Sequence, residues 1–115
     1  MLLLQTMQKL PLASSAVGWG VMLGYIFEWD GKKAESNARK HGVTFDEACT
    51  AFKDPLALLM PDPDHSLSEE RYIVLGMSSQ QRLLVVTFAE RPPRTRLISA
   101  RRPTRRERRR YEEEG

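Results

Sequence analysis

The chain has 115 residues and a mass of 13.2 kDa, the size of a single domain, which excludes a two-domain enzyme. Its composition, with 41% hydrophobic and 29% charged residues, is that of a globular protein, and it excludes a fibrous, disordered or disulfide-dense chain. The net charge of +3 is unevenly spread, because residues 91–115 hold ten Arg and four Glu (+6) while residues 1–90 carry −3. Clustered arginine suits phosphate, so we expect a nucleic acid or an acidic protein as partner; a solvated helix is the alternative.

The single cysteine bears on cofactors and cellular location, and the first residues bear on where the domain begins. Cys49 has no second cysteine to pair with and no metal-ligand spacing around it, so we expect no disulfide, no metal, no cofactor and a cytoplasmic location. No stretch approaches the roughly 18 to 20 apolar residues of a membrane span. Residues 1–21 carry one charge, Lys9, and show no periodicity, so we interpret them as a disordered or mis-annotated leader before a domain over residues 22–115. A secretory signal is the less favoured alternative, because Lys9 follows the apolar residues 2–4.

The first half of the domain shows one strand and two helices. Residues 25–29 are aromatic and β-branched, as strands are. Asp30 and Gly42 are capping residues around a mostly polar helix over residues 32–40. A second helix opens at Thr44, which has capping-box spacing to Glu47, and its apolar positions place Cys49 in the core.

The second half shows strands and a last helix. After the Asp54-Pro55 stop, a short strand is predicted over residues 56–60. Three more strands are predicted as an antiparallel meander, over residues 71–76, 82–90 and 95–102. The middle strand is apolar on both faces, so we place it in the centre of the sheet. Strict alternation in the last strand puts Leu97, Ser99 and Arg101 on one face and Ile98, Ala100 and Arg102 on the other.

The chain ends in a polar helix over residues 105–114. Thr104 and Glu107 repeat the capping-box spacing, and Tyr111 is its one aromatic residue, through which we expect it to dock. Helices and strands are segregated, so the sequence predicts an α+β fold with an antiparallel sheet of four to five strands, two N-terminal helices and one C-terminal helix.

The candidate chemistry is metal-independent RNA cleavage. In this reaction a ribose 2′-hydroxyl attacks the adjacent phosphorus, so a base, an acid and fixed positive charge are needed. His65 is the predicted base or acid and Glu70 its partner. Arg71 and Arg102 are the predicted phosphate and transition-state clamps. The predicted RNA-binding set is Lys40, Arg101, Arg105, Arg106 and Tyr111.

Simpler interpretations of the same residues stay open. His65 is equally an ordinary residue of a Pro/Asp-rich turn, and Glu70 and Arg71 belong to a charge cluster on an edge strand. A metal site at Asp62, Asp64 and His65 lacks the further ligands of a closed site. Arg101 and Arg102 point to opposite faces, so at most one of them lines a site.

A set of residues spread along the domain forms one ordered pattern: Phe27-Glu28-Trp29-Asp30, Lys33, Asn37, Arg39-Lys40-His41-Gly42-Val43, Phe45-Asp46-Glu47-Ala48, Asp54-Pro55, Asp62 to His65, Glu69-Glu70-Arg71, Gly76, Ile98-Ser99-Ala100-Arg101-Arg102, Thr104, Arg105, Glu107 and Tyr111. In order and spacing, this set resembles the BrnT-type toxins of bacterial type II toxin–antitoxin modules over about residues 24–114.

The resemblance implies a compact RelE-like ribonuclease fold and RNA cleavage that inhibits translation. It also implies neutralisation by a cognate BrnA-type antitoxin in a heterotetramer with two toxins. Two other functions remain as alternatives: a non-catalytic nucleic-acid-binding regulator, and a protein-interaction module that uses the arginine-rich end.

Overall fold

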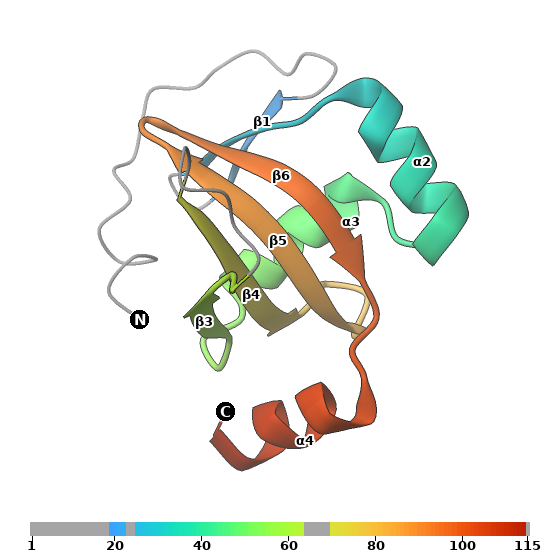
Figure 1. Ribbon diagram of the computed structural model, residues 1–115, viewed down its shortest axis with the longest axis vertical. Helices are drawn as coiled ribbons and strands as arrows, with labels where there is room; N and C mark the ends of the chain where they lie inside the picture. Colours follow the sequence, from blue (N-terminus) through green and yellow to red (C-terminus); the bar gives the residue numbers. More distant parts are fainter. Residues whose placement is uncertain (1–18, 23–24, 64–69, 115) are drawn as a thin grey trace.

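The computed structural model describes residues 19–22, 25–63 and 70–114, which form a six-stranded sheet with helices packed around it (Figure 1). The strand order is β1-β2-β6-β5-β4-β3. The strands are β1 (Trp19–Met22), β2 (Tyr25–Glu28), β3 (Leu58–Pro61), β4 (Arg71–Met77), β5 (Leu83–Arg91) and β6 (Arg94–Arg101). The helices are α2 (Gly31–His41), α3 (Phe45–Thr50), which runs on into the 3-10 turn η1 (Ala51–Lys53), and α4 (Arg105–Glu114). The predicted α+β class and the predicted helix order are confirmed.

The sheet is mixed and has six strands among the described residues, which corrects the prediction of an antiparallel sheet of four to five strands. Strands β3 to β6 form the predicted antiparallel meander with β5 in its interior. Strand β2, however, pairs with β6 in parallel, with Phe27 opposite Thr95. The reason is that α2 and α3 carry the chain across the sheet before the meander brings β6 back beside β2. Strand β1 pairs with β2 and begins at Trp19, inside the segment interpreted as a leader; residues 1–18 lie outside the described residues.

Both N-terminal helices begin at the predicted caps. The Asp30 carboxylate accepts a hydrogen bond from the Lys32 amide at 2.9 Å. Gly42 ends α2 with a left-handed φ of 69°, a conformation that glycine adopts without strain, and its amide donates to the Ala38 carbonyl at 2.9 Å. At α3, the Thr44 hydroxyl accepts from the Glu47 amide at 3.1 Å.

Helices α2 and α3 pack on one face of the sheet, which we call the covered face. Aromatic rings fill this layer, with the Phe52 centroid 4.9 Å from that of Phe27 and 5.1 Å from that of Phe88. A Cβ on Gly76 would lie 2.6 Å from the Ala51 carbonyl oxygen, so this glycine lets η1 approach β4. Cys49 is buried here, as predicted, and burial raises the pKa of its thiol to about 12.

A β-bulge changes the predicted faces of β6. Ser99 is opposite Thr87 and Leu97 is opposite Phe88, so Ile98 is the extra residue. Leu97 and Ala100 are therefore both buried in the core of the covered face. The strict alternation predicted for this strand is wrong, because a bulge resets the period.

The opposite face, which we call the open face, carries neither α2 nor α3. In Figure 1, β5 and β6 pass in front of α3, and α4 lies at the far end of this open face. A smaller apolar cluster sits there, with Leu75, Leu83 and Val85 buried and Tyr111 of α4 packed against it. Among the described helices, none is long and apolar enough to cross a membrane.

Candidate functional site

Arginine side chains from three strands project onto the open face. Val85 belongs to the apolar cluster of this face, and Arg101 is its partner on β6. Counting alternate residues from these two, with the bulge included, gives five arginines on the same face: Arg71 of β4, Arg91 of β5, and Arg94, Arg96 and Arg101 of β6.

The register arranges these side chains in rows across the sheet. Arg71 is opposite Ala89, Ala89 is opposite Arg96, and Arg96 is opposite Glu28. We call these four residues the arginine row. Since neighbouring strands lie about 4.8 Å apart, the Cα atoms of Arg71 and Arg96 are about 10 Å apart, with only a small alanine between them.

Hydroxyl and further arginine side chains flank the arginine row. Arg91 is opposite Arg94 on one side of it, and Thr87 is opposite Ser99 on the other. Guanidinium and hydroxyl groups are the donors that proteins use to bind phosphate oxygens. The open face can therefore hold a phosphodiester chain over three strands.

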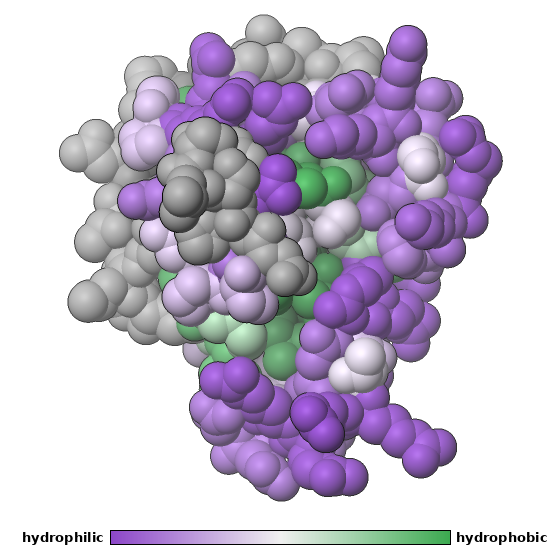
Figure 2. All heavy atoms as spheres, viewed as in Figure 1, coloured by the Kyte–Doolittle hydropathy of each residue, from purple (hydrophilic) through white to green (hydrophobic). Residues whose placement is uncertain are grey.

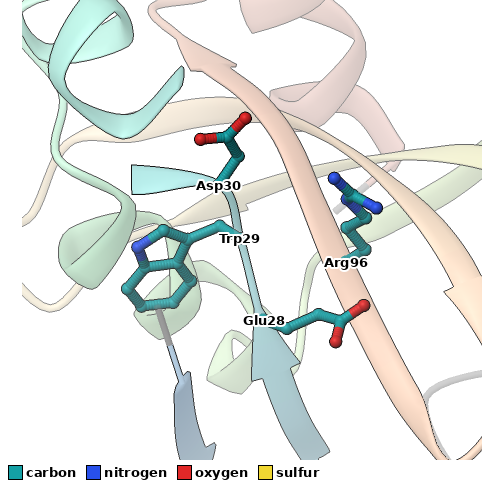
Figure 3. Close-up of a pocket in the computed structure, with 4 residues that line it drawn as sticks. All are labelled: Glu28, Trp29, Asp30 and Arg96. Carbon is teal, nitrogen blue, oxygen red and sulfur yellow. The ribbon is translucent and has the colours of Figure 1, made fainter. Parts of the chain in front are cut away.

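The Glu28 carboxylate partly offsets the positive charge at the β2 end of the arginine row. Figure 3 shows Glu28 and Arg96 on neighbouring strands, while the Trp29 ring turns to the other side of β2. Together with Asp30 they line a polar hollow of about 180 Å³. The Glu28 carboxylate also lies 3.8 Å from Arg94, so this end of the face offers acceptors as well as donors.

Arg101 joins the open face to α4. Its two terminal nitrogens each donate to a Glu107 oxygen at 2.9 Å. The Thr104 amide also donates to Glu107, at 2.8 Å, and the Glu107 amide donates to the Thr104 hydroxyl, so both halves of the predicted capping box are present. The hydrogen bond from Arg101 is the main reason that the pKa of Glu107 falls to about 2.

Tyr111 holds the other end of α4, as predicted. Its hydroxyl donates to Asp54 at 2.6 Å, and the same carboxylate oxygen accepts from the Met77 amide at 2.8 Å. Burial, and then the contact with Asp54, raise the pKa of Tyr111 to about 12. Arg105 and Arg106 are exposed on this anchored helix.

Glu70 is turned away from Arg71. Its carboxylate accepts from the Tyr72 hydroxyl at 3.2 Å, and Tyr72 packs against the core of the covered face. Glu90 lies nearby, and its pKa is raised first by burial and then by the charge of Glu70. His65 falls in residues 64–69, which lie outside the described residues.

Arg102 and Lys40 also lie apart from the arginine row. Lys40 is exposed in the last turn of α2, on the covered side. Arg102 follows β6 and lies near Glu47 of α3. The pKa of Glu47 is lowered mainly by the hydrogen bond from Arg82, and the charge of Arg102 makes the smallest contribution to this lowering. The structure thus brings Arg71 and Arg101 to one face with Arg106 and Tyr111 at its border. The predicted roles of all these residues remain predictions.

The family comparison covers strands β3 to β6, which carry the arginines of this face. The model of the ribonuclease toxin BrnT of type II toxin–antitoxin systems matches residues 29–107, from the residue after β2 into the first turn of α4. The chain belongs to the BrnT family. None of the curated proteins matches it.

In this BrnT-family chain, Arg94 and Arg96 are the arginines of the open face that lie beside the predicted Arg71 and Arg101 and that sequence reasoning missed. Arg94 and Arg96 alternate with the buried Thr95 and Leu97, a pattern visible in the sequence. Pairing Arg96 with Arg71 through Ala89 requires the strand register, which the sequence does not reveal. A BrnT toxin belongs to a type II module, so its family implies an antitoxin partner.

Proposed function

We propose that this protein is a RelE-like endoribonuclease toxin that binds single-stranded RNA on its open face and cleaves it without a metal ion. The observation that carries the proposal is the arginine row, in which Arg71 and Arg96 face the same side about 10 Å apart. RNA is favoured over DNA because the proposed chemistry uses the 2′-hydroxyl.

The chemistry needs fixed positive charge at the reacting phosphate. The 2′-oxygen forms a bond to phosphorus, the bond from phosphorus to the 5′-oxygen breaks, and a 2′,3′-cyclic phosphate is left. Negative charge builds on the phosphorane oxygens, and losing one donor aimed at such charge costs about 3 to 4 kcal/mol. Guanidinium stays charged at every working pH, so Arg71 and Arg96 can supply this donor without proton transfer.

The proton-transfer roles rest on the sequence. His65 remains the proposed base or acid with Glu70 as its partner, and Arg102 remains a proposed clamp. Arg105 and Arg106 border the open face on α4 and are proposed to hold the RNA strand as it leaves. Lys40 would then bind RNA only where the strand passes round to α2.

The proposed partner is a BrnA-type antitoxin, in a cytoplasmic heterotetramer with two toxins. The open face supports this, because acidic side chains of a partner would find the same arginines that we propose for RNA. Such an antitoxin would act by competing with the substrate for the arginine row.

Incubation of the purified protein with RNA in EDTA tests this function. We expect cleavage with 2′,3′-cyclic phosphate ends, and suppression when the antitoxin is added. The matched control is the same oligonucleotide with 2′-deoxyribose at the cleaved position, which should stay intact. Salt-sensitive binding without cleavage would favour the regulator, and neither binding nor cleavage would favour the protein-interaction module.

A further inference from the structure

A groove lies on the open face where α4 meets the sheet. Figure 2 shows apolar side chains of this region in green directly beside the purple surface of α4. The groove has a volume of about 160 Å³. Its lining consists of Met60, Ile73, Leu75 and Val85 from the sheet and Arg106, Glu107 and Arg110 from α4.

The two anchors of α4 hold this groove in place. Tyr111 is tied to Asp54, and Glu107 is tied to Arg101, so the helix is fixed at both ends of the contact. The floor is apolar, because Leu75 and Val85 are almost fully buried beneath it. The walls carry the charge, so the groove is amphipathic across its width.

Two arginines of α4, Arg106 and Arg110, line the groove. The Arg110 Nη1 lies 3.8 Å from the Met60 sulfur and its Nε donates to Glu114 at 2.9 Å, so the guanidinium lies beside Met60 in the groove lining. Arg106 is exposed and has no ion pair with any other described residue. Glu107, the one acid in the lining, is neutralised by Arg101.

The groove continues the arginine row. Ile73 follows Arg71 by two residues on the same face, a step of about 6.6 Å along the strand. Val85 in the floor is opposite Arg101. The lining of the groove therefore begins two residues along β4 from the arginine row, within reach of a nucleotide whose phosphate lies on Arg71.

We propose that this groove binds one nucleobase of the RNA substrate, an inference that rests on the proposed function. The base would enter edge first onto the apolar floor, with the guanidinium groups of Arg106 and Arg110 against its face and its phosphate on the arginine side. This makes α4 a substrate-binding element that selects unpaired RNA, because a base within a duplex cannot turn into the groove.

A single flat group suits the groove better than a docked helix. A helix binds through several anchors spaced three or four residues apart and needs a long groove. This groove has a volume of only about 160 Å³ between α4 and the sheet, and the two planar guanidinium groups of its lining match a π-system. A docked protein segment is the alternative that the experiment must separate.

Methyl NMR of the intact protein tests the inference without requiring cleavage. The Ile, Leu and Val methyl groups are followed during titration with adenosine 5′-monophosphate, and with ribose 5-phosphate as the control that lacks a base. We expect saturable shifts at Ile73, Leu75 and Val85, with binding of ribose 5-phosphate at least tenfold weaker. Arg106→Ala should weaken nucleotide binding about tenfold. The matched control is Arg108→Ala, which lies on the opposite side of α4 and outside the groove lining.

A second variant fills the groove. Met60→Trp on the edge strand β3 should abolish the methyl response while the circular dichroism spectrum stays unchanged; if this variant misfolds, the Arg106 comparison still decides. Equal methyl shifts with adenosine 5′-monophosphate and ribose 5-phosphate, or no shifts with either, would overturn the proposal. Methyl shifts at the groove on addition of the antitoxin, with none on addition of the nucleotide, would also overturn it. Because the titration is read without RNA cleavage, a failure of the cleavage assay and a failure of base binding are separate results.

Discussion

Glu47 shows how one buried carboxylate joins three parts of this protein. It is 3% exposed and accepts from Ser78 at 2.7 Å and from the Arg82 Nε at 2.9 Å, with a second contact from the Arg82 Nη2. Arg82 also donates to the Gly42 carbonyl at 3.1 Å. Glu47 therefore ties α3 to the start of β5 and, through Arg82, to the end of α2.

Replacing Glu47 should destabilise the fold. Glu47→Ala leaves Ser78 and the Arg82 guanidinium without their acceptor beside the core, so we expect the free energy of unfolding in urea to fall by about 2 to 3 kcal/mol. The control is Glu35→Ala, an exposed glutamate of α2, which should change it by less than about 0.5 kcal/mol. Equal, small effects of both variants would show that the buried pair contributes nothing.

At the scale of single residues, local spacing predicts the backbone caps and the burial of Cys49, but not the distant partners of a side chain. The Thr44 cap is present as predicted, but Glu47 does not close the capping box, because Arg82 and Ser78 bind its carboxylate. Those partners are 35 and 31 residues away, beyond any local pattern. Asn37 is similar, since its buried amide bonds the backbone of Ala100 across the molecule at 2.8 and 3.0 Å.

Among the elements, α4 depends most on a few contacts. Its residues are all at least partly exposed, and it has little apolar surface to bury. Docking through Tyr111 was predictable, because Tyr111 is its one aromatic side chain. Its second anchor was not, since the contact of Arg101 with Glu107 depends on which face of β6 Arg101 takes after the bulge.

The Glu107 anchor should weaken in acid. Its pKa falls from 4.5 to about 2 on folding, so its contribution is complete above about pH 5 and is lost as the pH falls towards 2. Both side chains are about one-third exposed, so we expect only about 1 kcal/mol.

Hydrogen exchange measures this anchor directly. Protection factors of the α4 amides in Glu107→Gln at pH 7 should be about fivefold lower than in the wild type, with the difference shrinking below pH 3. The exposed Glu112→Gln on the same helix is the control. Protection of α4 that is the same in Glu107→Gln and in the wild type would contradict the role of the pair.

In the whole molecule, the two faces of the sheet carry different kinds of side chains. The covered face holds the aromatic core under α2 and α3, and the open face holds the arginine row and the groove beside α4. The basic end of the chain was visible in the charge distribution. Bringing Arg71 of β4 into line with Arg96 depends on a meander register and a bulge, both of which arise only when the strands pair.

The arginine row carries the central claim, that RNA is cleaved on the open face. The decisive measurement is the rate of RNA cleavage in EDTA by the double variant Arg71→Ala/Arg96→Ala, compared with Arg39→Ala, an exposed arginine of α2 on the covered side. We predict at least about a hundredfold loss for the double variant, with an unchanged circular dichroism spectrum, and less than about a twofold change for Arg39→Ala. A folded double variant that cleaves RNA as fast as the wild type would contradict the account.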